Sequence, residues 1–147
     1  MKYTPLIALF VLGFAQKSLG IEPPPTEVVM FDHATVEQAL AKGQKLSINS
    51  SFKIQGGHRV GPGVVEIHEH DTDIFYVTQG AATFVTGGTA IDPKSVGPGE
   101  FHADKMTGGT VHHLTQGDVI VIPSGIPHQF TEVSGGTFVY FVVKVTK

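Results

Sequence analysis

The sequence predicts one all-β domain, an antiparallel sandwich or barrel, preceded by a single short helix. A chain of 147 residues suits one domain. Everything after Gly43 consists of short runs rich in β-branched and aromatic residues, separated by glycine-rich turns. The chain has no cysteine, so disulfides, zinc-thiolate sites and cysteine nucleophiles are all excluded. The domain therefore has to rest on its hydrophobic core.

The first twenty residues have the pattern of a secretory signal. Met1 and Lys2 form a short basic start, residues 6–15 are apolar, and residues 18–20 are Ser-Leu-Gly, which suits a signal peptidase. The apolar stretch is too short to span a bilayer, and an uncleaved anchor is the alternative. We therefore expect residues 1–20 to be cleaved and the protein to be secreted or periplasmic. The net charge of −3 and the lack of any basic run argue against nucleic acid or anionic membrane as partners.

Residues 21–45 are expected to form an N-terminal arm and a helix. The three prolines at 23–25 make the start of the arm stiff and extended, and residues 28–31 could form a first strand. Residues 35–42 (TVEQALAK) predict the helix, with Thr35 as its N-cap and Gly43 at its end.

Residues 46–147 are expected to form the barrel. The predicted strands cover residues 46–54, 63–70, 74–78, 82–86, 119–122 and 137–145. The connection at 87–117 breaks this rhythm and is expected to be a lid, a rim loop or a disordered segment. It carries Glu100, His102 and Asp104, which could close over a site or form a solvated polar loop.

Residues 68–73 read HEHDTD and contain the first candidate ligands. On a strand, His68 and His70 would point to the same face and could chelate one metal ion. Paired histidines on a strand are more often polar surface residues, so this pattern alone is weak. In residues 117–130 (GDVIVIPSGIPHQF), a β-rich run meets a Pro-Ser-Gly turn, which aims His128 from a rigid corner.

These two segments resemble the two motifs of the cupin family. The second motif is a glycine, five residues, Pro-x-Gly, two residues and a histidine, and it is met at Gly117, Pro123, Gly125 and His128. The first motif resembles residues 63–80. The resemblance implies a small antiparallel β-barrel of jelly-roll type, with the site inside the barrel.

The resemblance also implies one divalent metal, held by His68, His70 and His128. Asp73 stands near the place where cupins usually carry a glutamate, and it is a candidate fourth ligand. Glu132 replaces the final asparagine of the second motif. Three imidazoles suit Fe, Zn, Ni or Cu, whereas a carboxylate ligand makes Mn more plausible, so the sequence leaves the metal open.

Glu66 lies two residues before His68 and is expected to share its inward face. A carboxylate inside a barrel is costly unless it is paired or functional. Glu66 is therefore the candidate for proton transfer, with a raised pKa, or it orients a ligand histidine. A bulge that turns it to solvent is the alternative. One of His112 and His113 could also enter the site, since adjacent strand residues face opposite ways.

Strand parity also predicts which side chains near the candidate site face into the barrel and which face outward. Phe75 and Val77 are expected to line the barrel, and Tyr76 to face outward. Arg59 is the sole arginine, and it could pair with a carboxylate substrate or form a surface ion pair.

The predicted function is that of an exported metal-binding cupin that acts on a small molecule, with a lean toward an oxygenase-type oxidoreductase. Lyase, decarboxylase and isomerase chemistry are the enzymatic alternatives. A non-catalytic module for metal or a small ligand, and a metal-free barrel, are alternatives of another class. The apolar run at 138–145 has more hydrophobic surface than one interior face can use, which predicts a homodimer.

Overall fold

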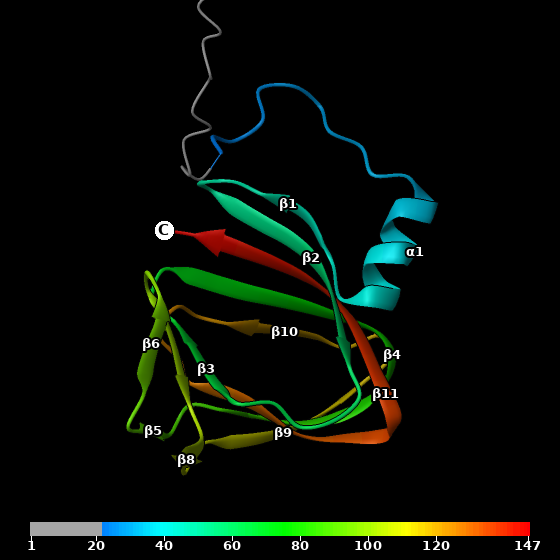
Figure 1. The fold of residues 1–147 in the computed structure, drawn as a ribbon. Helices are drawn as coiled ribbons and strands as arrows, with labels where there is room; N and C mark the ends of the chain where they lie inside the picture. Colours follow the sequence, from blue (N-terminus) through cyan, green and yellow to red (C-terminus); the bar gives the residue numbers. More distant parts are fainter. Residues whose placement is uncertain (1–21) are drawn as a thin grey trace, which may run out of the picture.

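The computed structural model describes residues 22–147, so the predicted signal at 1–20 lies outside the described residues. The described chain is almost entirely β-structure with one helix near its start (Figure 1). The elements are α1 (His33–Lys42), β1 (Lys45–Ile48), β2 (Phe52–Arg59), β3 (Val65–His68), β4 (Asp71–Thr86), β5 (Thr89–Ile91), β6 (Lys94–Gly97), β7 (Glu100–Ala103), β8 (Lys105–Thr107), β9 (Thr110–Thr115), β10 (Val119–Ile122) and β11 (His128–Thr146).

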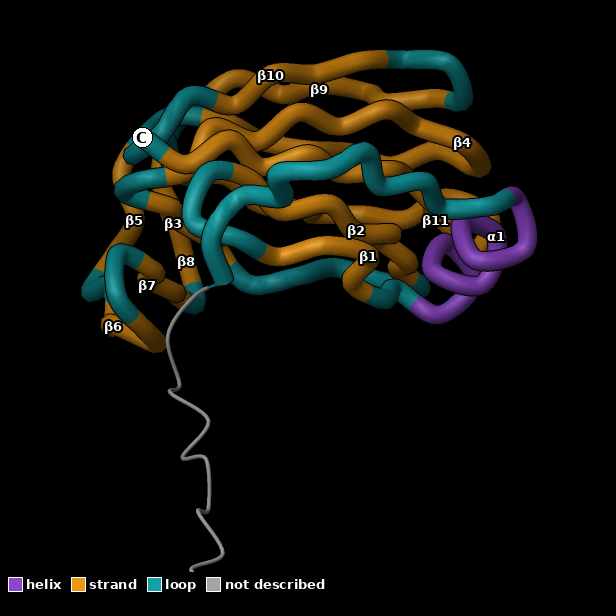
Figure 2. The backbone as a smooth tube through the Cα atoms, turned by 90° about the horizontal axis from the view of Figure 1, so that it is seen from above, coloured by secondary structure: helices purple, strands orange, loops and turns teal. Residues whose placement is uncertain are grey.

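The two long strands β4 and β11 pair antiparallel and connect the rest of the curled sheet. Strand β11 continues the sheet through β2 to β1 and through β3 to β7 and β6, while β4 pairs with β9 and β10. In Figure 2, β9 and β10 lie on one side and β1 and β2 on the other, with α1 at one end. The predicted antiparallel β-barrel with one short helix is confirmed.

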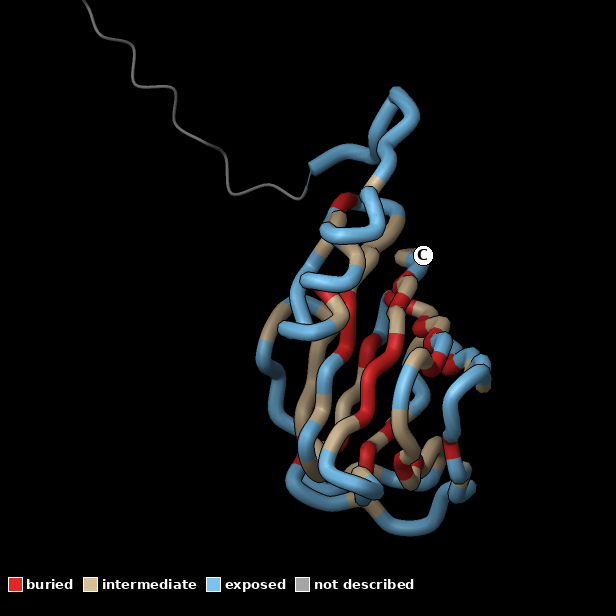
Figure 3. The backbone as a smooth tube through the Cα atoms, turned by 90° about the vertical axis from the view of Figure 1, so that its right-hand side faces the viewer, coloured by how far each residue is buried: buried red, intermediate tan, exposed pale blue. Residues whose placement is uncertain are grey.

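The core fills the inside of the curl. Phe75 and Val77 of β4 are buried, as strand parity predicts, and Tyr76 between them is 49% exposed. Phe75 and Val77 pack in a cluster of apolar side chains from β4, β9, β10 and β11, dominated by aromatic rings such as Phe130 and Tyr140. Figure 3 shows the buried positions along the central strands, with the N-terminal arm exposed.

The helix begins two residues earlier than predicted. Asp32 is the N-cap rather than Thr35, because its carboxylate accepts a hydrogen bond of 2.8 Å from the Thr35 backbone N–H. Gly43 ends the helix in the left-handed conformation, as expected. The strand predicted at 28–31 is wrong: this segment forms no strand and its side chains are largely exposed.

The expected loop at 87–117 is wrong as well, because β5 to β9 occupy most of it. Gly56 and Gly57 lie inside β2 rather than in a turn. A Cβ on Gly56 would lie 2.3 Å from the Ala39 carbonyl oxygen, and one on Gly57 would meet the ring of Tyr140. These glycines therefore let α1 and a core aromatic ring approach the sheet.

The C-terminal apolar run is used within the chain. Phe138, Tyr140 and Val142 are buried in the core, and Val139 is buried on the opposite face, beside α1. The surplus hydrophobic surface on which the homodimer was predicted is therefore largely covered, and the homodimer stays a prediction. Among residues 22–147, no helix is long and apolar enough to cross a membrane.

The close approach of α1 to β2 gives a test of the fold. Gly56→Ala places a methyl group against the Ala39 backbone, which cannot move without shifting the helix, and should cost about 1–3 kcal/mol of unfolding free energy. Gly61→Ala is the matched control, since a Cβ there meets nothing within 4 Å. Denaturant unfolding of both variants measures the difference. Equal stability of the two would contradict the packing of α1 on β2.

Candidate metal centre

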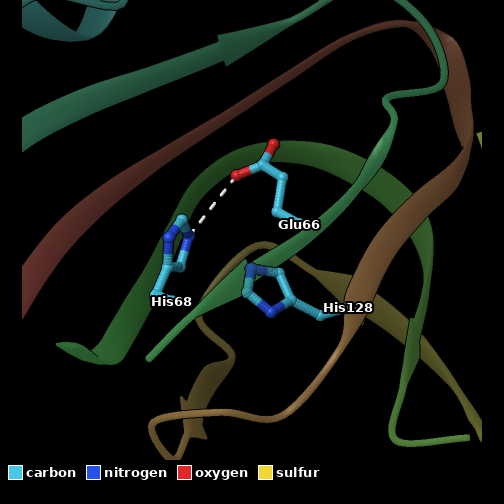
Figure 4. A group of neighbouring side chains, drawn as sticks. All are labelled: Glu66, His68 and His128. Carbon is cyan, nitrogen blue, oxygen red and sulfur yellow. Dashed lines mark ion pairs between the residues drawn. The ribbon is translucent and has the colours of Figure 1, made fainter. Parts of the chain in front are cut away.

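Strands β3 and β11 bring Glu66, His68 and His128 together at one end of the barrel. His128 lies directly opposite Glu66 in the register of the two strands, and His68 follows two residues later on β3. One ligand atom from each of the three residues lies within 4.8 Å of the other two (Figure 4). Both histidines are buried, so these atoms converge where little water reaches.

The partners of the Nδ1 atoms set which imidazole nitrogen faces the centre. His128 Nδ1 donates a hydrogen bond of 2.9 Å to the carbonyl oxygen of Ile126. His68 Nδ1 contacts the carboxylate of Glu100, which lies opposite it on β7. In the neutral rings both protons therefore sit on Nδ1, and both Nε2 atoms turn a lone pair toward the centre.

Asp73 and Lys144 complete the centre from β4 and β11. Asp73 is 1% exposed, and its Oδ2 lies 3.5 Å from His68 Nε2 and 4.0 Å from His128 Nε2. The Lys144 ammonium donates to Asp73 Oδ2 at 2.8 Å and to His68 Nε2 at 2.7 Å. Opposite pairing of the two residues in the β4–β11 register produces this contact.

Arg59 sets the charge state of Glu66. Its guanidinium lies 2.9 Å from Glu66 Oε1, donates to the Tyr140 hydroxyl and covers the ring of Phe130. Burial raises the pKa of Glu66, but the contact with His68 at 3.5 Å and the charge of Arg59 outweigh burial and hold this pKa at about 2. The expected raised pKa is therefore wrong, and Glu66 is a carboxylate at neutral pH. The alternative of Glu66 turning out to solvent is also wrong.

The two histidines have opposite pKa shifts. Burial lowers the pKa of His128, which keeps the ring neutral at neutral pH. Burial also lowers the pKa of His68, but Glu66, Asp73 and Glu100 outweigh burial and the charge of Lys144, so this pKa is raised. The contact with Lys144 decides whether the His68 imidazole is neutral or protonated. An ammonium can only donate hydrogen bonds, so Nε2 at 2.7 Å has to accept one, and His68 is neutral in this arrangement.

His70 lies outside this group. Strand β3 ends at His68, so the expectation that both histidines project from one face of a strand is wrong. The bend that follows leaves His70 exposed, with its ring against Gly99. The predicted ligands His68, Asp73 and His128 are brought together, and Glu66 joins them as its parity predicts.

The remaining predicted histidines are also placed elsewhere. His112 hydrogen-bonds the Thr86 hydroxyl at 2.8 Å, and His113 is exposed. His102 lies on β7 and lines a cavity of about 510 Å³ together with Asp104, a cavity that none of the converging ligands lines. The predicted lid is therefore a strand that pairs with β3, and the side chain of Glu100 contacts His68 of the centre.

Lys144 was missed by the sequence reasoning, although a signal was present. It shares strand parity with Phe138, Tyr140 and Val142, which are all buried. The alternating apolar run therefore predicts that the side chain of Lys144 points into the barrel. An inward lysine at the end of such a run needs a buried anion, and Asp73 is that anion.

The donor set fits a divalent cation. Glu66 Oε2, Asp73 Oδ2 and the two Nε2 atoms are all acceptors. His128 Nε2 and Asp73 Oδ1 are buried without a hydrogen-bond partner among residues 22–147. Buried acceptors without donors are costly, and a cation bound at the centre would offset that cost. Two imidazoles and a carboxylate also form the donor set of non-haem Fe(II) sites.

Comparison with known families agrees with this geometry. The family model described as Cupin matches residues 59–147, which include every residue of the centre. The chain is a cupin. A search of curated proteins found no match. His128, the histidine of the second segment, is buried and lies within the matched residues.

Solved structures show the same fold at low sequence identity. A Bacillus halodurans protein matches with a TM-score of 0.61 and 15% identity, over 87% of each chain. A Klebsiella pneumoniae protein with a double-stranded β-helix domain matches at 0.53 and 18% identity, over 82% of this chain and 91% of the other. The Schizosaccharomyces pombe Cnp3 cupin domain matches at 0.53 and 14% identity, with 71% of this chain spanning 64% of that one. These identities establish the fold alone.

The lowered pKa of Glu66 predicts a pH dependence of stability. The carboxyl has a pKa of about 2 in the folded protein against 4.5 without these contacts. Its contribution is therefore complete above pH 4.5 and is lost as the pH falls toward 2. We expect a loss of about 2–3 kcal/mol over this window, allowing for partial exposure of the side chain.

The Glu66→Gln variant lacks this titrating carboxyl and is compared with the wild type. Unfolding free energies of the two proteins, measured from pH 6 to pH 2, should converge as the pH falls. Parallel curves would show that the Arg59 and His68 contacts do not stabilise the carboxylate.

Proposed function

We propose that this cupin binds one divalent transition metal, such as Fe, Mn, Zn, Ni or Cu, and uses it to act on a small molecule. Glu66, His68 and His128 are the ligands in this proposal, and Asp73 is the adjacent carboxylate. The ligand set keeps His68 and His128 from the sequence prediction and replaces His70 with Glu66, and Asp73 stays beside it. The donor set favours an oxygenase-type oxidoreductase.

The convergence of acceptors inside the barrel carries the proposal. Acceptor atoms of Glu66, His68 and His128 converge, and Asp73 Oδ2 lies within 4.0 Å of both Nε2 atoms. Lys144 brings the positive charge that reaches both His68 and Asp73. A structural polar cluster would pair donors with acceptors. An excess of acceptors, with the imidazoles fixed through their Nδ1 atoms, is what a metal site requires.

The residues around the centre have separable roles in this proposal. A metal supplies Lewis-acid or redox chemistry when bound. Glu100 and the Ile126 carbonyl hold the two imidazoles in the ligating tautomer. Arg59 holds Glu66 ionised, so Glu66 serves as a ligand rather than as a base with a pKa near 7. Phe130 and the aromatic core exclude water from the inner side.

A second candidate is a non-catalytic module that binds the metal or a small ligand. A cavity lined by Glu100, which contacts His68, favours it. This cavity has a volume of about 160 Å³ and is lined by Glu100, Lys53 and His70 among others. Drug-sized ligands occupy cavities of about 300–1,000 Å³. The space beside the centre therefore suits a substrate of few atoms, or none.

Metal content tests the proposal and separates the two ligand sets. The purified protein should retain one equivalent of a transition metal, measured by elemental analysis, and His128→Ala should lose it. His70→Ala is the matched control and should keep it, because His70 is exposed and outside the group. Loss in His70→Ala would restore the three-histidine set, and a metal-free wild type that takes up no added metal would refute the proposal.

Turnover separates the enzyme from the binding module. The metal-loaded protein should consume oxygen with a small hydroxy- or keto-acid, or with a β-dicarbonyl compound, while His128→Ala should not. One bound equivalent without turnover of any such compound would favour the binding module.

A further inference from the structure

Lys144 occupies a position that a bound metal would need. Its ammonium donates to His68 Nε2 at 2.7 Å and to Asp73 Oδ2 at 2.8 Å, and the residue is buried. It comes from β11, the strand that also carries His128.

The chemistry of the imidazole makes the two cations exclusive. A neutral imidazole has one nitrogen lone pair, and His68 Nδ1 is engaged with Glu100, so Nε2 is the nitrogen left to bind. That lone pair either accepts a hydrogen bond from the Lys144 ammonium or coordinates a metal. Ligation by His68 therefore requires the ammonium to leave Nε2.

The charges reinforce this competition. Asp73 is 1% exposed and its nearest counter-charge is Lys144, so the ammonium stabilises the centre when no metal is bound. A divalent ion bound to the neighbouring ligands would supply that counter-charge itself and would repel an ammonium a few ångströms away. Glu66 is neutralised independently by Arg59.

We propose that Lys144 is a tethered cation that competes with the metal and sets the metal affinity of the barrel. It holds His68 and Asp73 in place in the metal-free protein and is displaced from Nε2 when a metal binds. This inference rests on the proposed function, because it assumes that the centre can bind a metal.

Lys144→Met tests the competition, because methionine keeps most of the side-chain volume and removes the charge. We expect Co²⁺ to bind this variant at least about tenfold more tightly than the wild type at one fixed pH. Calorimetric titration of metal-stripped protein measures the affinity. The metal-free variant should also melt at a lower temperature than the wild type and should gain more from added Co²⁺, because the metal replaces the missing counter-charge of Asp73.

Two control variants separate charge from packing. Lys144→Arg keeps a cation at the site and should not tighten binding. Lys147→Met removes a lysine three residues away, which is exposed and contacts Ser124, and should leave the affinity unchanged. Equal tightening in Lys147→Met would mean that overall charge, not the contact with His68, controls the affinity.

A second pair of variants covers the case in which Lys144→Met fails to fold with an unpaired Asp73. Asp73→Asn removes the buried charge, and Asp73→Asn/Lys144→Met removes the ammonium as well. The double variant should bind Co²⁺ more tightly than Asp73→Asn alone. Equal or weaker binding would overturn the inference.

The outcomes also separate this inference from the proposed function. Binding of Co²⁺ by the wild type with the same affinity in Lys144→Met would overturn the competition and leave the metal site standing. Binding in Lys144→Met but not in the wild type would support the competition and refute a resident metal. Absence of binding in every variant, including the double variant, would refute both.

Discussion

Buried acceptors in excess of donors are the constraint on which the centre depends. The acceptor atoms of the centre belong to Glu66, His68, Asp73 and His128. The cations that contact them are the Lys144 ammonium and the Arg59 guanidinium. Such a cluster is unfavourable unless positive charge is shared among its members. The centre therefore favours a bound cation, whether this is the Lys144 ammonium or a metal ion. An anionic ligand would have to bind through that cation.

The sheet register makes the cluster possible. The pairing of β4 with β11 places Asp73 opposite Lys144, and the pairing of β11 with β3 places His128 opposite Glu66. Each pair therefore arises from residues far apart in sequence that the ladder holds at fixed spacing. Residues on strands are held more precisely than residues on loops, because backbone hydrogen bonds on both sides restrict them. The order of the four ligand residues in the sequence has no role in this geometry.

Strand parity predicted the parts of the site that lie within strands. It placed Glu66 beside His68, and Phe75 and Val77 in the core. It failed for His70, because the alternation holds only while the strand continues and β3 ends at His68. Where a four-residue strand ends depends on its pairing with β7, which no local pattern in the sequence reveals.

Residues 87–117 show a second limit of sequence patterns. Their glycines and prolines indicated a loop, yet they form short strands whose turns use those glycines. Short strands of three to six residues carry too few alternating positions to stand out from a loop. The contact of Glu100 with His68 could not be predicted for the same reason, because it exists only once β7 has paired with β3.

The pairing of β7 with β3 also determines how the centre meets solvent. Glu100 is partly exposed, contacts Lys53 at 3.8 Å and lines the cavity of about 160 Å³, while its carboxylate reaches the buried ring of His68. His68 is thus the one imidazole of the centre linked to the surface through a charged side chain, whereas His128 is anchored to a backbone carbonyl. A change of charge near Glu100 would therefore act on His68 and leave His128 largely unaffected. Lys144 also contacts His68 rather than His128, so His68 is the imidazole on which two charged side chains act.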